Sequence, residues 1–393
     1  MGKSRGKEDQ GMPNILDYID WRGDLPLAVS PFNEVDALIL AELSYLDLDG
    51  VVSEDEPSSA PTLAEICEQY QALGRSQSFL GNDPAPTLLR VAACERFAGS
   101  KVFSYVNLVD AERELQLSAV SFALSDGTVC AAFRGTDNSL VGWREDFNFC
   151  YQSQTAGQRE AALYLNRLAF RTAAPLRVTG HSKGGNFAAY AAAFCDPTLR
   201  EKRLLHAYIN DAPGFNRAIA GQPEWAAVQK KLHVVIPESS FFGVLLQTKE
   251  EKKLIRSDAT GLYQHNPYSW QVRGTHFEAA DGRSASSLFM DETIRRWMDS
   301  LDDSQRADFV QTFFDSLESA GVPTLSAMKA EPMHVFNATV SAIRRMPPEL
   351  QRSAFSALGK LAAAGGGTLR DELKRALERR GIELLPGRRS TDG

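Results

Sequence analysis

Three short apolar segments alternate with three helical segments between residues 158 and 236, and this alternation restricts the fold more than any other feature of the chain. The expected strands cover residues 176–179, 205–210 and 232–236, and the expected helices cover residues 158–171, 186–194 and 223–231. Neighbouring parallel strands need a crossover of this length, and such crossovers are right-handed. The pattern therefore predicts an α/β fold, a mainly parallel sheet with helices on both faces.

The segments on either side extend this plan. Two further strands, 115–124 and 128–133, are separated by a Ser-Asp-Gly turn, in which glycine can take a positive φ. Apolar residues recur at a helical period upstream, over residues 33–46, 62–73 and 84–97, and downstream, over residues 288–301, 303–320, 335–345 and 348–363. A glycine triplet at 365–367 then leads to a last helix. The sequence thus predicts N-terminal helices, an α/β core and a C-terminal helical extension.

Composition and charge exclude several other classes of protein. With 393 residues, 43% of them hydrophobic, the chain can bury one large core or two ordinary ones. A formal net charge of -7, with no stripe of Lys or Arg, disfavours nucleic acid as a partner.

The cysteines and the N-terminal segment bear on location. The five cysteines are scattered, odd in number and lack Cys-x-x-Cys spacing, so we expect neither a disulfide framework nor a zinc site. No apolar stretch follows the basic N-terminus, and no run of about 18 apolar residues occurs. We therefore expect no metal, no cofactor, no transmembrane segment and a cytoplasmic location.

The strongest chemical signal is the stretch Gly180-His181-Ser182-Lys183-Gly184, which follows a short apolar strand and opens an alanine-rich helix. A serine hydroxyl is a weak nucleophile unless it is exposed beside a base, and a Gly-x-Ser-x-Gly turn holds it on a sharp corner between strand and helix. Gly180 and Gly184 leave room for the crossing backbone, and the helix start directs free N–H groups towards the reacting oxygen. The motif predicts Ser182 as a nucleophile, against the alternative of a purely structural glycine-rich turn. The flanking side chains of His181 and Lys183 are expected to point away from the serine.

Acyl transfer also needs N–H donors for the negative charge that develops on the carbonyl oxygen. The backbone N–H of Lys183 is one candidate, since it follows the nucleophile. The other candidate is Thr136, in the loop 133–137, where Gly135 permits a tight backbone. The alternative interpretation of this loop is an ordinary exit from a strand.

These segments resemble the class 3 lipase-like α/β hydrolases and, more closely, an uncharacterised bacterial branch of them, a domain of unknown function. The resemblance lies in Ala132–Thr136 with Trp143 and Asp146 after it, and in the Gly-His-Ser-Lys-Gly-Gly motif. Further matches to that branch are residues 14–18, 31–36 and 210–215, and His265 followed by Trp270.

The resemblance covers roughly residues 13–325 and has several implications. It implies an α/β-hydrolase domain at 13–325; the polar, glycine-containing residues 1–12 are expected to form a disordered tail, and the helical pattern predicts a C-terminal extension at 326–393. It also implies Thr136 as an oxyanion residue and places residues 137–149 where lipases carry a lid. Lipases usually have Leu at the position of Lys183, so an apolar site that acts at a lipid–water interface is less expected here.

Among the six histidines, His265 is the preferred base. It lies in a loop after the candidate strand 253–257, where a sheet of this type presents its base, and His276 is the alternative. The other four precede the serine, begin apolar strands or lie in the helical tail: His181, His206, His233 and His334.

The acid partner of the base has two candidates. Class 3 lipases place Asp after the strand that corresponds to 232–236, where this chain has Glu238 and no Asp. Asp211 follows the preceding strand, and because adjacent strands lie about 4.8 Å apart it can reach the same imidazole. We prefer Asp211, with Glu238 second. The structural alternative for Asp211 is to cap the turn before Ala-Pro-Gly, and both roles can coexist.

Three other features have structural interpretations. Arg134 is expected to pair with a neighbouring acid such as Asp146. The apolar run 240–246 is expected to pack in the core rather than to line an acyl pocket or touch a membrane. The last helix carries Leu369, Leu373 and Leu377 on one face, which either docks on its own domain or meets a partner.

Together these features predict a serine hydrolase with a small-molecule acyl ester as substrate. Ser182 would attack the carbonyl carbon, His265 would take and return the proton, and Asp211 would orient the imidazole. One alternative is a non-catalytic hydrolase-fold module that binds a protein partner through its C-terminal helices. Another is an acyltransferase that uses the same residues.

Overall fold

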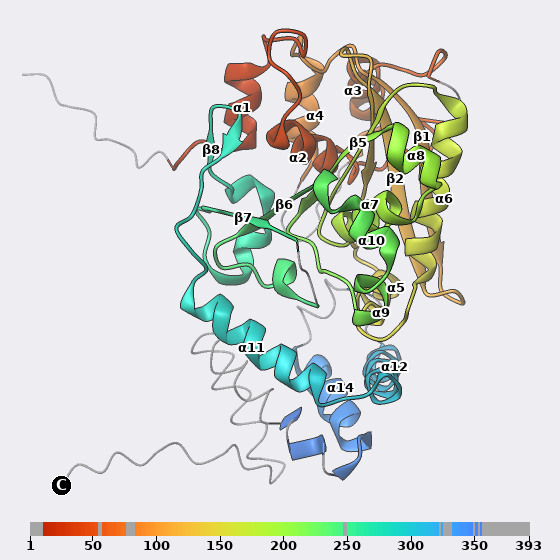
Figure 1. The fold of residues 1–393 in the computed structure, drawn as a ribbon, viewed down its shortest axis with the longest axis vertical. Coiled ribbons are helices and arrows are strands. Elements are labelled where there is room, and N and C mark those ends of the chain that lie inside the picture. The colour runs from red at the N-terminus through yellow and green to blue at the C-terminus, as the bar shows by residue number, and fades with distance from the viewer. Residues whose placement is uncertain are drawn as a thin grey trace, which may run out of the picture.

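The computed structural model describes residues 11–53, 57–75, 83–246, 250–321, 324, 332–348, 350–352 and 354–355. Its centre is a seven-stranded sheet in which the strands follow one another in chain order, from β1 to β7 (Figure 1). The strands are β1 (Lys101–Asp110), β2 (Leu115–Ala123), β3 (Val129–Phe133), β4 (Leu176–His181), β5 (Leu204–Asn210), β6 (Leu232–Pro237) and β7 (Lys252–Ile255). The first three strands pair antiparallel, and β3 to β7 are parallel. The predicted mainly parallel sheet is confirmed.

The crossover helices pack on one face of the sheet. Right-handed crossovers that always step to the next strand in the same direction place their helices on one side. These helices are α6 (Ala156–Arg171), α7 (Lys183–Phe194), α8 (Pro197–Lys202) and α10 (Pro223–Val228), followed by the 3-10 turn η1 (Gln229–Lys231). Residues of these helices share one apolar core with inward-facing residues of β2 to β6.

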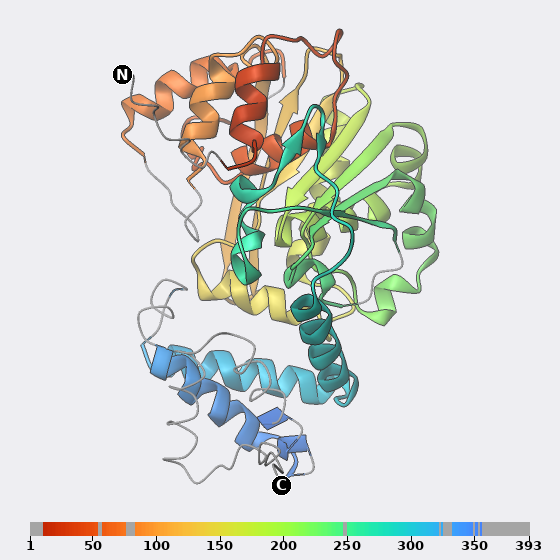
Figure 2. The same cartoon turned by 90° about the vertical axis from the view of Figure 1, so that its left-hand side faces the viewer.

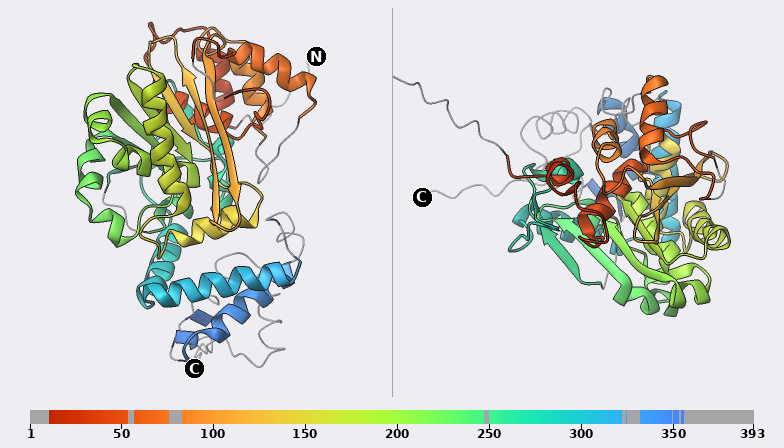
Figure 3. Two further views of the ribbon diagram at one scale, coloured as in Figure 1. Left: turned by 90° about the vertical axis from the view of Figure 1, so that its right-hand side faces the viewer. Right: turned by 90° about the horizontal axis from the view of Figure 1, so that it is seen from above.

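The opposite face of the sheet is covered by N-terminal helices instead of crossovers. Figures 2 and 3 show these helices against the sheet, on the side away from α6 and α7. They are α1 (Ile15–Arg22), α2 (Glu34–Leu43), α3 (Leu63–Ala72) and α4 (Ala85–Ala92). The central helix, α2, is buried along almost its whole length and packs on β3, β4 and β5.

A buried ion pair fastens these N-terminal helices together. Asp36 accepts hydrogen bonds from Arg96 Nε at 2.8 Å and Nη2 at 2.5 Å, and from the Tyr18 hydroxyl at 2.9 Å. Arg96 also donates to the backbone carbonyls of Leu25 and Ser30 at 2.9 and 2.8 Å. The motif residues at 14–18 and 31–36 thus have a structural role, which is to close the second face of the sheet.

The chain after β7 returns across the carboxyl end of the sheet and then becomes helical. The returning part contains η3 (Gly261–His265), η4 (Pro267–Ser269) and the short pair β8 (Val272–Arg273) and β9 (His276–Phe277). The helices that follow are α11 (Ala285–Asp299), α12 (Asp303–Ser319) and α14 (Pro332–Arg345). The remaining elements, α5 (Leu140–Asn148), α9 (Arg217–Ala220) and η2 (Phe242–Val244), lie in loops at the same end.

Aromatic contacts join the C-terminal helices to α5. The Phe147 ring of α5 lies 6.0 Å from the Phe313 ring and 5.5 Å from the Phe314 ring of α12, while α12 packs along α14. No helix in the described part of the chain is long and apolar enough to cross a membrane.

Strand β1 was not expected from the sequence. A bulge between Phe103 and Val106 interrupts its pairing with β2, and Ser104 takes a φ of 55°. This interruption breaks the period of two on which strand prediction depends. The other predicted strands and helices up to residue 345 occur within a few residues of their expected bounds. The glycine triplet 365–367, the last helix and residues 1–10 lie outside the described residues.

Candidate active site

The serine of the glycine motif lies on a sharp corner between β4 and α7. Ser182 has a φ of 59° and a ψ of -133°, a left-handed conformation that non-glycine residues rarely adopt. From Val178 to Ala193 every residue is buried except Ser182, which is partly exposed. Its backbone N–H donates to the carbonyl of Asn210 at 3.0 Å, which ties the corner to β5. The fold therefore presents this one side chain to solvent.

The corner requires glycine at positions 180 and 184, because other backbone segments pass so close to these two residues that no side chain would fit. A Cβ added to Gly180 would lie 2.1 Å from the Gly184 carbonyl oxygen, and one added to Gly184 would lie 2.0 Å from the Phe133 carbonyl oxygen. Both distances are far shorter than any real Cβ contact. The corner thus depends on both glycines, for the reason that the sequence suggested.

His265 and Asp211 form a hydrogen-bonded pair beside this corner. Nδ1 of His265 lies 2.6 Å from Oδ2 of Asp211, although the two residues are 54 positions apart. Asp211 directly follows β5 and is fully buried. Its other oxygen, Oδ1, accepts from the Ser240 hydroxyl and from the Gly243 N–H at 3.1 Å. A carboxylate acceptor at this distance favours the tautomer with its proton on Nδ1, on the Asp211 side, so that Nε2 is the nitrogen on the far side of the ring.

Two aromatic rings pack close to the His265 imidazole. The Phe242 ring lies on one side at 4.1 Å between centroids, and the His181 ring lies at 4.5 Å. His181 Nε2 also donates to the backbone carbonyl of His265 at 3.0 Å. The ring of His181 is therefore not directed to the substrate side, and its role is to support the loop that carries His265.

Buried polar groups continue behind His181. Its Nδ1 lies 3.3 Å from the Tyr45 hydroxyl and 3.6 Å from Oε1 of Glu42. Burial and the nearby His265 hold the pKa of His181 well below its usual range, and burial raises the pKa of Glu42 to about 8. Both groups are thus neutral at pH 7, which is consistent with their position in the apolar space between α2 and β4.

The loop after β3 lies against the serine. A Cβ added to Gly135 would be 3.2 Å from Ser182 Cβ, so this backbone passes next to Ser182. Thr136 follows and donates its hydroxyl to Asp146 of α5. Burial raises the pKa of Asp146 to about 6, a shift that the Lys183 ammonium and the Thr136 hydroxyl oppose.

Lys183, the first residue of α7, has a fully buried side chain. Its Nζ donates to the carbonyl of Gly142 at 3.1 Å and lies 3.6 Å from Oε2 of Glu145. As predicted, the side chain points away from the serine. The first N–H groups of a helix lack intrahelical acceptors, so the N–H of Lys183 remains a candidate donor for an oxyanion.

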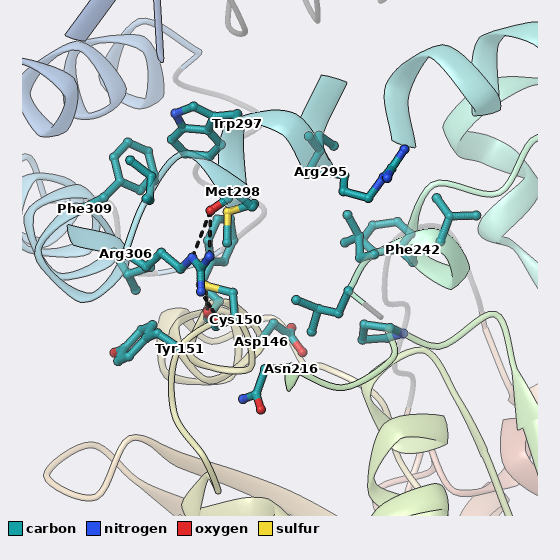
Figure 4. Close-up of a pocket in the computed structure, with 18 of the residues that line it drawn as sticks. Asp146, Cys150, Tyr151, Asn216, Phe242, Arg295, Trp297, Met298, Arg306 and Phe309 are labelled. Atoms are coloured by element: carbon teal, nitrogen blue, oxygen red, sulfur yellow. Dashed lines mark hydrogen bonds between the residues drawn. The ribbon is translucent and has the colours of Figure 1, made fainter. Parts of the chain in front are cut away.

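These residues open into a cavity of about 730 Å³. Ser182, His265 and Thr136 line it. The side with Asp146 and Asn216 is called its floor here, and the opposite side, with Trp297 of α11 and Phe309 of α12, is called its roof (Figure 4). The apolar lining residues are Trp143, Phe147, Cys150, Pro213, Ala218, Phe241, Phe242, Val244, Leu245, Leu246, Ile294, Trp297, Met298, Leu301, Phe309 and Val310. The run 240–246 thus lines the cavity for most of its length, and the expectation that it does not line a pocket was wrong. Core packing holds in part, because Val244 belongs to the core under the crossover helices and Leu246 packs against it. Its aromatic residues follow β6 at the carboxyl edge of the sheet, where ligands bind in open α/β folds.

Arg306 fastens the roof of the cavity to its floor. It donates to the carbonyl of Met298 at 3.2 and 2.7 Å and to the carbonyl of Cys150 at 3.4 Å (Figure 4). The sequence offered no signal for this contact, because it joins positions 156 residues apart.

The other candidate residues lie elsewhere. Glu238 is partly exposed beside β7, and no hydrogen bond or ion pair of its carboxylate is found within the described ranges. His276 is exposed and lies 3.6 Å from Glu34, outside the cavity lining. His206 and His233 bond to each other at 3.0 Å, and His334 lies on α14.

The expected ion pair of Arg134 with a neighbouring acid forms, but with Asp137 and not with Asp146. Arg134 donates to Asn107 at 3.0 Å and lies 3.7 Å from Asp137. Asp146 instead accepts from Thr136. The sequence also missed Ser240 and Gly243, which hold Asp211, and the only available signal was their place after a parallel strand.

Sheet and site together define an α/β protein with a serine, a histidine and a carboxylate gathered at the carboxyl edge of a mainly parallel sheet. The chain belongs to the Mbeg1-like family, a lipase-like family, whose model matches residues 91–315. The matched segment contains β1 to β7, Ser182, Asp211 and His265. A search of curated proteins finds no match.

Proposed function

We propose that this protein is a serine hydrolase of the α/β-hydrolase type that cleaves carboxylic esters through an acyl-enzyme. The observation that carries the proposal is the 2.6 Å bond between His265 and Asp211 at the cavity that Ser182 also lines. The proposed α/β-hydrolase domain, residues 13–325, contains every residue of this site, and membership of a lipase-like family supports the same reaction class.

In the proposed reaction, Nε2 of His265 removes the proton from the Ser182 hydroxyl as its oxygen attacks the ester carbonyl. The tetrahedral oxyanion accepts hydrogen bonds from the backbone N–H groups of Lys183 and Thr136. His265 then gives the proton to the leaving alcohol, and the C–O bond of the ester breaks. Water, activated by the same imidazole, releases the acid and restores Ser182. Asp211 fixes the tautomer throughout and stabilises the imidazolium.

The chemical character of the cavity favours an apolar acyl group. Its walls are mostly aromatic and aliphatic, and about 730 Å³ is within the range of ligand sites that bury most of a small molecule. We therefore propose a small-molecule ester whose acyl chain lies under α11 and α12 while its carbonyl lies at Ser182.

Labelling with a fluorophosphonate probe tests this proposal. We expect the probe to modify wild-type protein at Ser182, Ser182→Ala to abolish labelling, and His265→Ala to slow it at least 100-fold, the low end of the effect of a general base. His276→Ala is the matched control, because its imidazole lies outside the cavity, and it should label like the wild type. Folded wild-type protein that is not labelled at any pH would contradict the proposal.

Acyl transfer to an acceptor other than water would use the same residues. The products of a turnover reaction separate the two outcomes, since hydrolysis yields free acid and transfer yields a new ester or amide. A protein partner bound through the C-terminal helices stays a prediction; a pull-down that depends on residues 330–393 and is indifferent to Ser182→Ala would support it.

A further inference from the structure

Both candidate oxyanion donors are fastened to a single helix, α5. Thr136 reaches α5 from the loop after β3, through its hydroxyl and the Asp146 carboxylate. Lys183 reaches α5 from the elbow, the sharp corner between β4 and α7 that carries Ser182, through Nζ and the carbonyl of Gly142 at 3.1 Å. The second connection requires a long cationic side chain, and Leu, which lipases usually have at this position, could not make it.

The buried ammonium has acidic neighbours on α5. Nζ of Lys183 lies 3.6 Å from Oε2 of Glu145, and both side chains are completely inaccessible to solvent. Glu145 is held independently, because its oxygens accept from the backbone N–H of Gln116 at 2.9 Å and of Gly157 at 2.6 Å. Breaking a buried ion pair by removing one partner leaves an uncompensated charge, so the lysine and this acid depend on each other.

We propose, on the basis of the function above, that Lys183 is a positioning residue for the oxyanion hole: its buried ammonium ties the elbow to α5 and keeps Asp146 as the anionic acceptor that holds Thr136. The neutral acid would offer Thr136 a weaker acceptor than the carboxylate does, since bonds to ionised acceptors are the stronger ones.

Several charged or titratable groups face Asp146. They are Lys183 from α7, Glu145 from its own helix, Asp137 from the loop after β3, the hydroxyl of Tyr45, and Arg306 from α12, which lines the same cavity. Glu145 and Asp137 raise the pKa of Asp146, while Lys183 lowers it. Arg306 is engaged with backbone carbonyls and pairs with Asp303 at 2.8 Å. Lys183 is thus the cation that offsets this acidic surrounding.

The experiment compares Lys183→Met with Lys183→Arg, and uses Lys202→Met as a control that removes an exposed lysine at the end of α8. The rate of fluorophosphonate labelling of Ser182 is measured from pH 5 to 9. In the plot of labelling rate against pH, we expect Lys183→Met to move the acidic limb to higher pH by roughly one unit, the low end of the effect of a nearby charge on the pKa of an Asp. Lys183→Arg and Lys202→Met should leave the limb in place.

A second background separates Asp146 from His265, whose protonation also lowers the labelling rate at acidic pH. In Asp146→Asn the amide oxygen can still accept from Thr136, but the side chain at position 146 does not titrate. Adding Lys183→Met to this variant should therefore produce no further shift of the acidic limb. A shift that persists in Asp146→Asn, or an acidic limb unchanged in Lys183→Met, would overturn the inference while leaving the proposed function intact.

Urea unfolding provides a readout that does not require activity. Burial raises the pKa of Asp146 to about 6, above the ordinary range of an Asp carboxyl, so stability falls as pH rises from that range to about 6 and then levels off. Without the Lys183 ammonium the pKa in the fold is higher, and we expect stability to keep falling between pH 6 and 8. If wild-type protein is not labelled, the proposed function fails; if the unfolding curves of Lys183→Met and Lys202→Met have the same pH dependence, the inference fails.

Discussion

Replacement of Asp211 by Asn tests the arrangement of the site most directly. The carboxylate accepts from His265 Nδ1 at 2.6 Å, from the Ser240 hydroxyl, and from the Gly243 N–H at 3.1 Å. The Asn amide has one oxygen, which can keep the bonds to Ser240 and Gly243, and one NH₂ group, which faces the imidazole. That NH₂ group favours the tautomer with its proton on Nε2, so the nitrogen that should accept the serine proton is already occupied.

The magnitude follows from the role of the acid. The same substitution in a Ser-His-Asp triad lowers kcat about 10⁴-fold, because the geometry survives while the tautomer is wrong. At about 1.36 kcal/mol per factor of ten, this corresponds to about 5.4 kcal/mol of transition-state stabilisation. The fold should lose much less, about 1 kcal/mol or so, because two of the three bonds to Asp211 remain.

The assay is the hydrolysis of a chromogenic short-chain ester, together with a thermal melt of each variant. Glu238→Gln is the matched control, since Glu238 was the competing acid and its carboxylate has no bond to His265. We expect Asp211→Asn to lose about four orders of magnitude in kcat and Glu238→Gln to retain wild-type rates. Wild-type turnover by Asp211→Asn, with activity lost in Glu238→Gln, would refute the reasoning.

Three further outcomes are expected. Gly184→Ala places a Cβ 2.0 Å from the Phe133 carbonyl oxygen, so it should lower Tm and abolish fluorophosphonate labelling; wild-type behaviour in both assays would contradict the elbow geometry. Asp36→Asn leaves the buried Arg96 guanidinium without its counter-charge and should cost about 3–5 kcal/mol in urea unfolding, whereas a loss below about 1 kcal/mol would contradict the role of this pair. Trp297→Ala removes part of the cavity roof and should raise KM for long-chain esters more than for acetate esters, and equal changes for both would argue against an acyl chain under α11.

The local elements of this protein could be predicted because each is encoded within a short window. The motif around Ser182 predicts its own corner, since Gly180 and Gly184 are the residues that allow the backbone to cross. The alternation of strands and helices predicts a parallel sheet, since crossovers of that length have few other solutions. Strand β1 was missed where a bulge at Ser104 interrupts the regular period.

Contacts between distant segments could not be predicted in the same way. The preference for Asp211 over Glu238 rested on the spacing of parallel strands, but which carboxylate faces His265 depends on where the loop 257–265 returns across the sheet. The apolar run 240–246 was assigned to the core because composition alone does not distinguish a packed interior from the wall of a cavity.

The sequence by itself determined the sheet, the corner that presents Ser182 and a short set of possible partners, because these depend on backbone sterics and periodicity over a few residues. Only the tertiary structure decided which imidazole and which carboxylate meet, and that Lys183 lies buried against α5. It also decided that α11 and α12 roof the cavity. Those outcomes depend on packing between segments tens to more than a hundred residues apart, where many side chains have the right chemistry and position selects among them.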